Sequence, residues 1–204
     1  MRTQHSKTFK LVLTGLFAAL CFVSFTFLQI KIPIPGGDAT SLHIGNAFCV
    51  LAALTLGGWY GGLAGAIGMT IADLFDPVYI LVAPKTFILK LCIGLITGYF
   101  AHRIAKIHES NDKKYILKWT TLSAVSGLGF NVIFDPIVGY FYKMYILGQP
   151  QEIAKVLAKL SAFTTFANAV ISTILVVFMY SAVRRIVTKQ SPVLPTESNK
   201  VVNQ

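Results

Sequence analysis

Long apolar segments alternate with short polar ones along the chain. Residues 11–30, 44–72 and 160–183 contain no charged side chain. The hydrocarbon core of a bilayer is about 30 Å thick, and a helix needs about 20 apolar residues to cross it. The pattern therefore predicts a polytopic membrane protein. The first segment is longer than the apolar part of a signal peptide and has no small-residue cleavage site, so we expect a retained helix.

The uncharged run at 44–72 is too long for one ordinary span and short for two. Its middle reads Gly57-Gly58-Trp59-Tyr60-Gly61-Gly62, a cluster that favours a tight turn with aromatic side chains at the membrane interface. We predict two short helices, at about 44–57 and 61–74. One tilted helix with extra glycines is the alternative.

Three further spans, at about 86–104, 119–142 and 160–183, complete the prediction. The expected fold class is all-α, a bundle of six transmembrane helices. Residues 190–204 are polar and contain Pro and Ser, so we expect a disordered tail after a membrane domain at 1–189.

Composition and charge agree with a membrane protein. Apolar residue types make up 54% of the chain and charged types 13%, against about 25% charged in soluble domains. Most of the 18 Lys and Arg residues precede the first span, lie at 103–118, or follow the last span. Six spans in an N-in/C-in topology place all three segments inside, as the positive-inside rule requires. The net charge of +10 is thus explained without nucleic acid.

Motifs for enzymatic or metal chemistry are absent from the sequence. It has no GxxxxGK[ST] phosphate loop and no HExxH motif. Cys21, Cys49 and Cys92 lie in apolar segments without CxxC spacing, so they are interpreted as small hydrophobic residues. We therefore expect no cofactor and no metal site, and the motifs give an enzyme activity no support.

Polar side chains gather at the predicted outer ends of the spans. Charged groups inside spans cost about 2.5–3.5 kcal/mol on insertion scales and are functional candidates. Their one-sided placement predicts a pocket that opens outward and captures an imported solute. The candidate binding residues are His43, Asn46, Asp73, Lys85, Lys90, Asn131, Asp135 and Asn168.

Several of these residues have a structural alternative. Lys90 either contacts the ligand or forms an ion pair with Asp73 or Asp135. Asn131 and Asp135 are spaced i, i+4 on one helix face with Gly127, which forms either a pocket wall or a seam between helices.

The remaining polar residues give weaker signals. His43 and Asn46 are at the predicted start of the second helix, where either could cap it, and Asp76 precedes a proline and is expected to start a turn. Asn168 is an isolated polar group in the last span. The loop at 31–38 either covers a pocket or only connects two spans.

Small residues on the first helix form a second feature. Gly15 and Ala19 are spaced i, i+4, with Ala18 beside them, and this spacing permits close helix contact. The same spacing recurs in pairs that we expect to pack within the bundle: Gly57/Gly61, Gly58/Gly62, Gly61/Gly65 and Gly94/Gly98.

The stretch at 41–104 resembles the substrate-binding S components of energy-coupling factor (ECF) vitamin transporters. The recurring elements are the entry to helix two at 43–47, the glycine-rich turn at 56–65, Asp73 at the end of helix three, and the A-P-x-T-F-I-x-K segment at 83–90. Length and six-span topology fit over the whole chain. Gly15 departs mildly from the alanine usual on helix one.

The resemblance implies a function and partners. S components bind a vitamin from outside and then dock, through small residues that correspond to Gly15, Ala18 and Ala19, on a transmembrane coupling subunit driven by two cytoplasmic ATPase subunits. Such a protein lies in the bacterial cell membrane and is not itself an enzyme. The expected nutrient is pyridoxine or hydroxymethylpyrimidine, pantothenate, or riboflavin. The alternative is a stand-alone six-helix secondary transporter or a small intramembrane enzyme.

Overall fold

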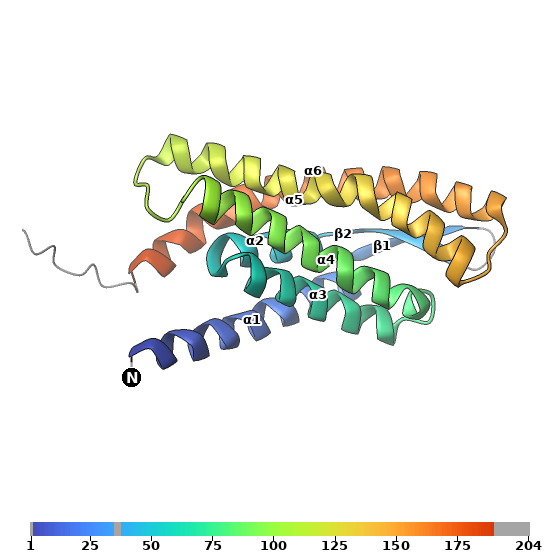
Figure 1. Ribbon diagram of the computed structural model, residues 1–204, viewed down its shortest axis with the longest axis horizontal. Helices are drawn as coiled ribbons and strands as arrows, with labels where there is room; N and C mark the ends of the chain where they lie inside the picture. The colour runs from blue at the N-terminus through green and yellow to red at the C-terminus, as the bar shows by residue number, and fades with distance from the viewer. Residues whose placement is uncertain (1, 35–37, 190–204) are drawn as a thin grey trace, which may run out of the picture.

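The computed structural model describes residues 2–34 and 38–189, which form six α-helices and one β-hairpin (Figure 1). The predicted tail at 190–204 lies outside the described residues. The α-helices are α1 (Arg2–Phe27), α2 (Gly45–Leu56), α3 (Gly58–Phe75), α4 (Ala83–Gly98), α5 (Lys113–Phe141) and α6 (Gln151–Lys189). The strands are β1 (Gln29–Ile34) and β2 (Asp38–His43). Three shorter turns of helix are η1 (Ile80–Val82), η2 (Tyr99–Ile104) and η3 (Tyr142–Ile146).

Four helical segments are long and apolar enough to cross a membrane: Lys7–Phe27, Ile80–Ile104, Lys113–Ile146 and Gln151–Arg184. The helical membrane character predicted from the sequence is therefore confirmed. α2 has 12 residues, which corresponds to about 18 Å and is shorter than a bilayer core. Six complete crossings and the N-in/C-in topology stay predictions.

The glycine cluster separates two short helices, as predicted, so one tilted helix is wrong. Gly57 ends α2 and precedes α3 with φ of 97°. L-residues with a side chain rarely adopt this backbone conformation, whereas glycine does so without steric cost. The break occurs one residue before Gly58, and α3 therefore starts earlier than expected.

The all-α prediction is wrong at 29–43, where the chain forms an antiparallel hairpin. The register pairs Gln29 with His43 at one end and Ile34 with Asp38 at the other. The sequence of β1, QIKIPI, alternates apolar with other residues, which is the period of a strand. Pro33 is compatible with a two-stranded sheet because both strands are edges. The described part of the segment predicted as a loop thus consists of two strands, and β2 packs on α6.

α3 packs closely against three other helices through glycines, as the small-residue spacing predicts. A Cβ atom would overlap a neighbouring helix at Gly61, Gly62, Gly65 and Gly68, and at Gly58 it would lie only 3.0 Å from α4, so larger residues would force the helices apart. Gly58 and Gly62 contact α4, Gly61 and Gly65 contact α2, and Gly68 contacts α1. Figure 1 shows the start of α1 and the end of α6 together at one end of the bundle, while the hairpin extends toward the other.

Candidate functional site

A pocket lies between β2 and helices α3, α4, α5 and α6. All eight residues predicted from the sequence line it: His43, Asn46, Asp73, Lys85, Lys90, Asn131, Asp135 and Asn168. The structure therefore brings together residues that lie up to 125 positions apart in the sequence.

Lys90 is buried and hydrogen-bonds to a neutral side chain. Its Nζ donates to Asn46 Oδ1 at 2.9 Å. Within the described part of the chain, no carboxylate oxygen lies within 4.0 Å of this nitrogen, so the alternative of an ion pair with Asp73 or Asp135 is wrong. Lys90 is about 8% exposed and lines the pocket, and its ammonium group has no direct counter-ion among the described residues.

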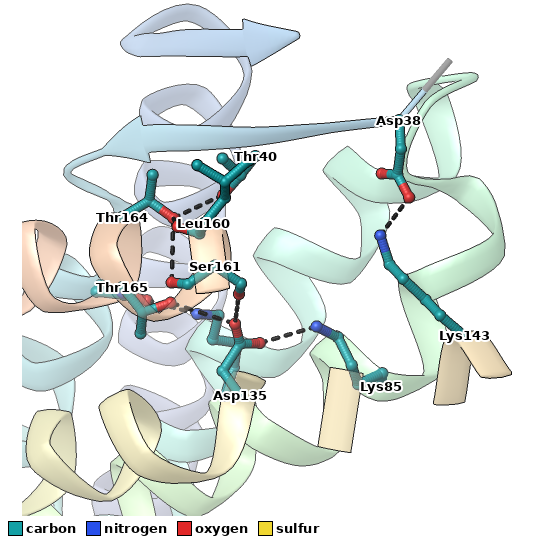
Figure 2. A network of polar contacts seen from close by, with 11 residues as sticks. Asp38, Thr40, Lys85, Asp135, Lys143, Leu160, Ser161, Thr164 and Thr165 are labelled. Carbon is teal, nitrogen blue, oxygen red and sulfur yellow. Dashed lines mark hydrogen bonds and ion pairs between the residues drawn. The ribbon is translucent and has the colours of Figure 1, made fainter. Parts of the chain in front are cut away.

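Asp135 instead pairs with Lys85, five residues before Lys90 on α4. Lys85 Nζ and Asp135 Oδ1 are 2.8 Å apart. The second carboxylate oxygen accepts hydrogen bonds from Ser161 and, at 3.2 Å, from Thr165, both on α6 (Figure 2). Asp135 is thus fully satisfied and connects α4, α5 and α6 at one wall of the pocket.

The face of α5 that carries Asn131, Asp135 and Gly127 serves both of its predicted purposes. Asn131 and Asp135 line the pocket. One turn before Asn131, a Cβ atom at Gly127 would overlap Thr97 of α4. The pocket wall therefore continues into a helix seam along the same face.

Asn168 holds the hairpin against α6. Its Oδ1 accepts from the backbone N–H of His43 and its Nδ2 donates to the backbone oxygen of Ser41, both at 2.9 Å. Neither His43 nor Asn46 caps α2, because His43 belongs to β2 and Ile44 occupies the cap position without a side-chain bond.

Sequence reasoning missed further contacts between the hairpin and the bundle. Thr40 and Thr164 hydroxyls lie 2.6 Å apart, and Asp38 forms an ion pair with Lys143 (Figure 2). A signal for the α6 contacts exists in the sequence. Ser161, Thr164, Thr165 and Asn168 follow the i, i+3, i+4, i+7 spacing of a single polar helix face.

Asp76 has the structural role that the sequence predicts. Its Oδ1 accepts from the backbone N–H of Val78 at 3.1 Å in the turn after α3. The other oxygen pairs with Lys31 of β1, which fastens the hairpin to this turn. Tyr79 follows in the same segment and lines the pocket, and burial raises its pKa to about 12. Its hydroxyl therefore stays protonated at physiological pH.

Several buried polar atoms that line the pocket have no hydrogen-bond partner within the described residues. They include His43 Nδ1, Asp73 Oδ2 and Asn131 Oδ1. The three residues are 8%, 2% and 2% exposed. Native proteins pair the great majority of buried polar atoms. These three side chains therefore carry hydrogen-bonding atoms along one cavity that no described residue uses.

The three small residues of the first helix face different surroundings. Gly15 and Ala19 are exposed on α1, and a Cβ atom at Gly15 would meet nothing within 4 Å. The backbone of Ala18 instead lies against Gly68 of α3. Packing within the chain therefore explains Ala18 and leaves Gly15 and Ala19 on an open face.

Known proteins resemble this chain in both sequence and fold. The chain is 33% identical over 79 residues to an uncharacterized protein in a gap 3′ region of Pyrococcus woesei, which is 39% of this chain and 51% of that protein. It thus spans about half the length of that curated relative. A structure of ThiT from Listeria monocytogenes superposes with a TM-score of 0.62 at 15% identity, covering 89% of this chain and 98% of ThiT. ThiT therefore shares the fold.

The sequence model of one family matches nearly the whole described chain, over residues 5–185. This span includes α1 with its open face, the hairpin, and each residue that lines the pocket. The chain belongs to the family of ECF-type riboflavin transporter S components.

Proposed function

We propose that this S component captures a water-soluble vitamin, riboflavin before the others, in the pocket under the hairpin. The observation that carries the proposal is the set of buried, unpartnered polar atoms around the pocket, namely His43 Nδ1, Asp73 Oδ2 and Asn131 Oδ1. A bound nutrient would supply hydrogen bonds to these atoms.

The charge balance of the pocket supports an uncharged ligand. Three lysines and three aspartates line it: Lys85, Lys90, Lys143, Asp38, Asp73 and Asp135. Because these formal charges cancel, the pocket as a whole does not select an anion such as pantothenate. Riboflavin and pyridoxine are neutral and rich in hydroxyl groups, and the family match favours riboflavin between them.

An aromatic wall supports a ring-containing ligand. Phe25 lines the pocket with its ring centroid 4.7 Å from that of His43 and 5.9 Å from that of Tyr79. Aromatic side chains contribute large apolar contact areas and pack on other rings at such distances. An isoalloxazine or pyridine ring would continue this cluster.

The proposed topology is N-in/C-in, in the bacterial cell membrane. The pocket then opens outward, and the open face with Gly15 and Ala19 lies toward the inside, where a transmembrane coupling subunit and its two ATPase subunits are expected. Capture and docking would take place at opposite ends of the bundle. The hairpin would cover the pocket as a lid.

Isothermal titration calorimetry of the purified chain with riboflavin, pyridoxine and pantothenate tests the identity of the ligand. We expect one riboflavin site per chain, weaker binding of pyridoxine, and no measurable heat with pantothenate. Preferential binding of pantothenate would contradict the charge argument.

Uptake measured in cells with and without the coupling subunit tests the transport role. We expect uptake to disappear when the coupling subunit is deleted, while the isolated chain still binds its ligand. Uptake that persists would identify an autonomous secondary transporter. Chemical turnover of the ligand by the purified chain would identify an enzyme.

A further inference from the structure

The polar groups that line the pocket fall into two classes. Lys85 and Asp135 satisfy each other, and Asn168 is satisfied by the hairpin backbone. The Asp73 carboxyl group hydrogen-bonds to Thr86, but its Oδ2 atom has no partner, and Lys90 uses a single described hydrogen bond, to Asn46. The first class builds the walls of the pocket, and the second class keeps hydrogen-bonding capacity that the described residues do not use.

Asp73 and Lys90 carry opposite charges that do not meet. Among the described residues, no lysine, arginine or histidine nitrogen lies within 4.0 Å of an Asp73 carboxylate oxygen, and Lys90 lacks a carboxylate in the same range. Both residues are nine-tenths or more buried, at 2% and 8% exposed. Burial of an unpaired charge is costly unless a partner is supplied.

We propose that Asp73 and Lys90 together determine specificity by holding one edge of the ligand that carries a hydrogen-bond donor beside an acceptor. The donor of the ligand hydrogen-bonds to Asp73 Oδ2, and its acceptor accepts a hydrogen bond from the Lys90 ammonium group. An imide or amide edge in a ring, as in the pyrimidine part of a flavin, has this arrangement. This inference rests on the proposed vitamin-binding function.

The same pair would reject ligands with a single kind of polar edge. A carboxylate would satisfy Lys90 but would face the Asp73 carboxylate, and an ammonium group would have the opposite conflict. Such discrimination by buried groups left unpaired is stronger than discrimination by shape. The pair therefore selects by the order of donor and acceptor rather than by net charge.

The first test needs no ligand and uses the thermal stability of the empty protein. Asp73→Leu removes the carboxylate while keeping a branched side chain of similar shape, and Asp73→Asn keeps the shape and removes the charge. We expect both to raise Tm by about 2 °C or more, because an unpaired buried charge is lost. The control Glu152→Gln changes an exposed carboxylate on α6 and should leave Tm unchanged. A fall in Tm for both Asp73 variants would assign Asp73 a structural role and overturn the proposal.

The second test compares riboflavin with 3-methylriboflavin, in which the ring N–H donor is blocked. We expect Asp73→Asn and Asp73→Leu to weaken riboflavin binding at least tenfold and 3-methylriboflavin binding less than twofold. An equal loss for both ligands would overturn the proposal. If the wild-type chain binds no riboflavin, the proposed vitamin is wrong, and the stability test still decides whether Asp73 is a binding group or a structural one.

Discussion

Asn168→Leu should release the hairpin from the bundle without removing any charge. In the wild-type protein the Asn168 amide satisfies the His43 N–H and the Ser41 oxygen, and all three residues are less than 9% exposed. Leu has a similar shape but neither a donor nor an acceptor. The substitution therefore leaves two buried backbone groups of β2 without partners.

The size of the effect follows from these two groups. A buried donor or acceptor that loses its partner costs about 1–3 kcal/mol. Loss of the partners of both the His43 N–H and the Ser41 oxygen therefore destabilises the closed hairpin by about 2–6 kcal/mol. The lower limit applies if the strand moves enough to reach water. Even about 2 kcal/mol corresponds to a roughly 30-fold larger open population, since about 1.4 kcal/mol is tenfold.

Amide hydrogen exchange of the hairpin, followed by mass spectrometry, measures this population. We expect peptides that contain β2 to exchange at least about 30-fold faster in Asn168→Leu and vitamin affinity to fall, with the exchange of α3 unchanged. Thr164→Val, which removes one contact between side chains, should have a smaller effect. Unchanged exchange of β2 in a folded Asn168→Leu protein would refute the anchoring role.

Five further substitutions probe other parts of the protein. Lys90→Ala and Asn131→Ala should each weaken vitamin binding by about 1–3 kcal/mol in calorimetry, and normal affinity in folded variants would make both residues structural. Ala19→Trp should keep vitamin affinity and Tm but reduce recovery of the complex with the coupling subunit, and an intact complex would exclude docking through this face. Gly62→Leu should lower Tm strongly or prevent folding, because a Cβ atom there overlaps α4, whereas Gly15→Leu should leave Tm nearly unchanged; equal Tm values would contradict the described packing.

The residues around the pocket could be found from the sequence because ionisable groups stand out in apolar helices. Polar residues are rare in the apolar spans, so Lys90, Asp73 and Asn131 are easily recognised. The predicted topology places all three at the same end of the helices. The Ser and Thr residues of α6 were missed since such residues are ordinary in membrane helices, where they hydrogen-bond to the preceding turn.

Pairing between these residues could not be predicted from spacing. Lys85 and Lys90 are five residues apart, or about 1.4 helical turns, so they point to different sides of α4. Which of them meets Asp135 depends on the rotation of α4 against α5, which is fixed by close packing at Gly127. Sequence periodicity determines the buried face to within one turn and does not resolve such a choice.

The extra structure outside the spans has a similar explanation. α6 begins at Gln151, nine residues before the predicted span, because a helix can continue beyond the apolar region. There Glu152 and Lys155 form an ion pair on its surface. The hairpin was predicted as a loop because its strands have only six residues each. Contacts with Asn168, Thr164 and Lys143, which are distant in sequence, hold these strands against the bundle.

Native mass spectrometry of the gently purified chain tests the central claim, that the pocket holds one vitamin molecule. The account predicts a 1:1 complex with a small molecule of riboflavin mass in the wild-type protein and its loss in folded Asn131→Ala. A protein that carries no such molecule after incubation with riboflavin, pyridoxine or pantothenate would contradict the account, as would equal retention by the variant.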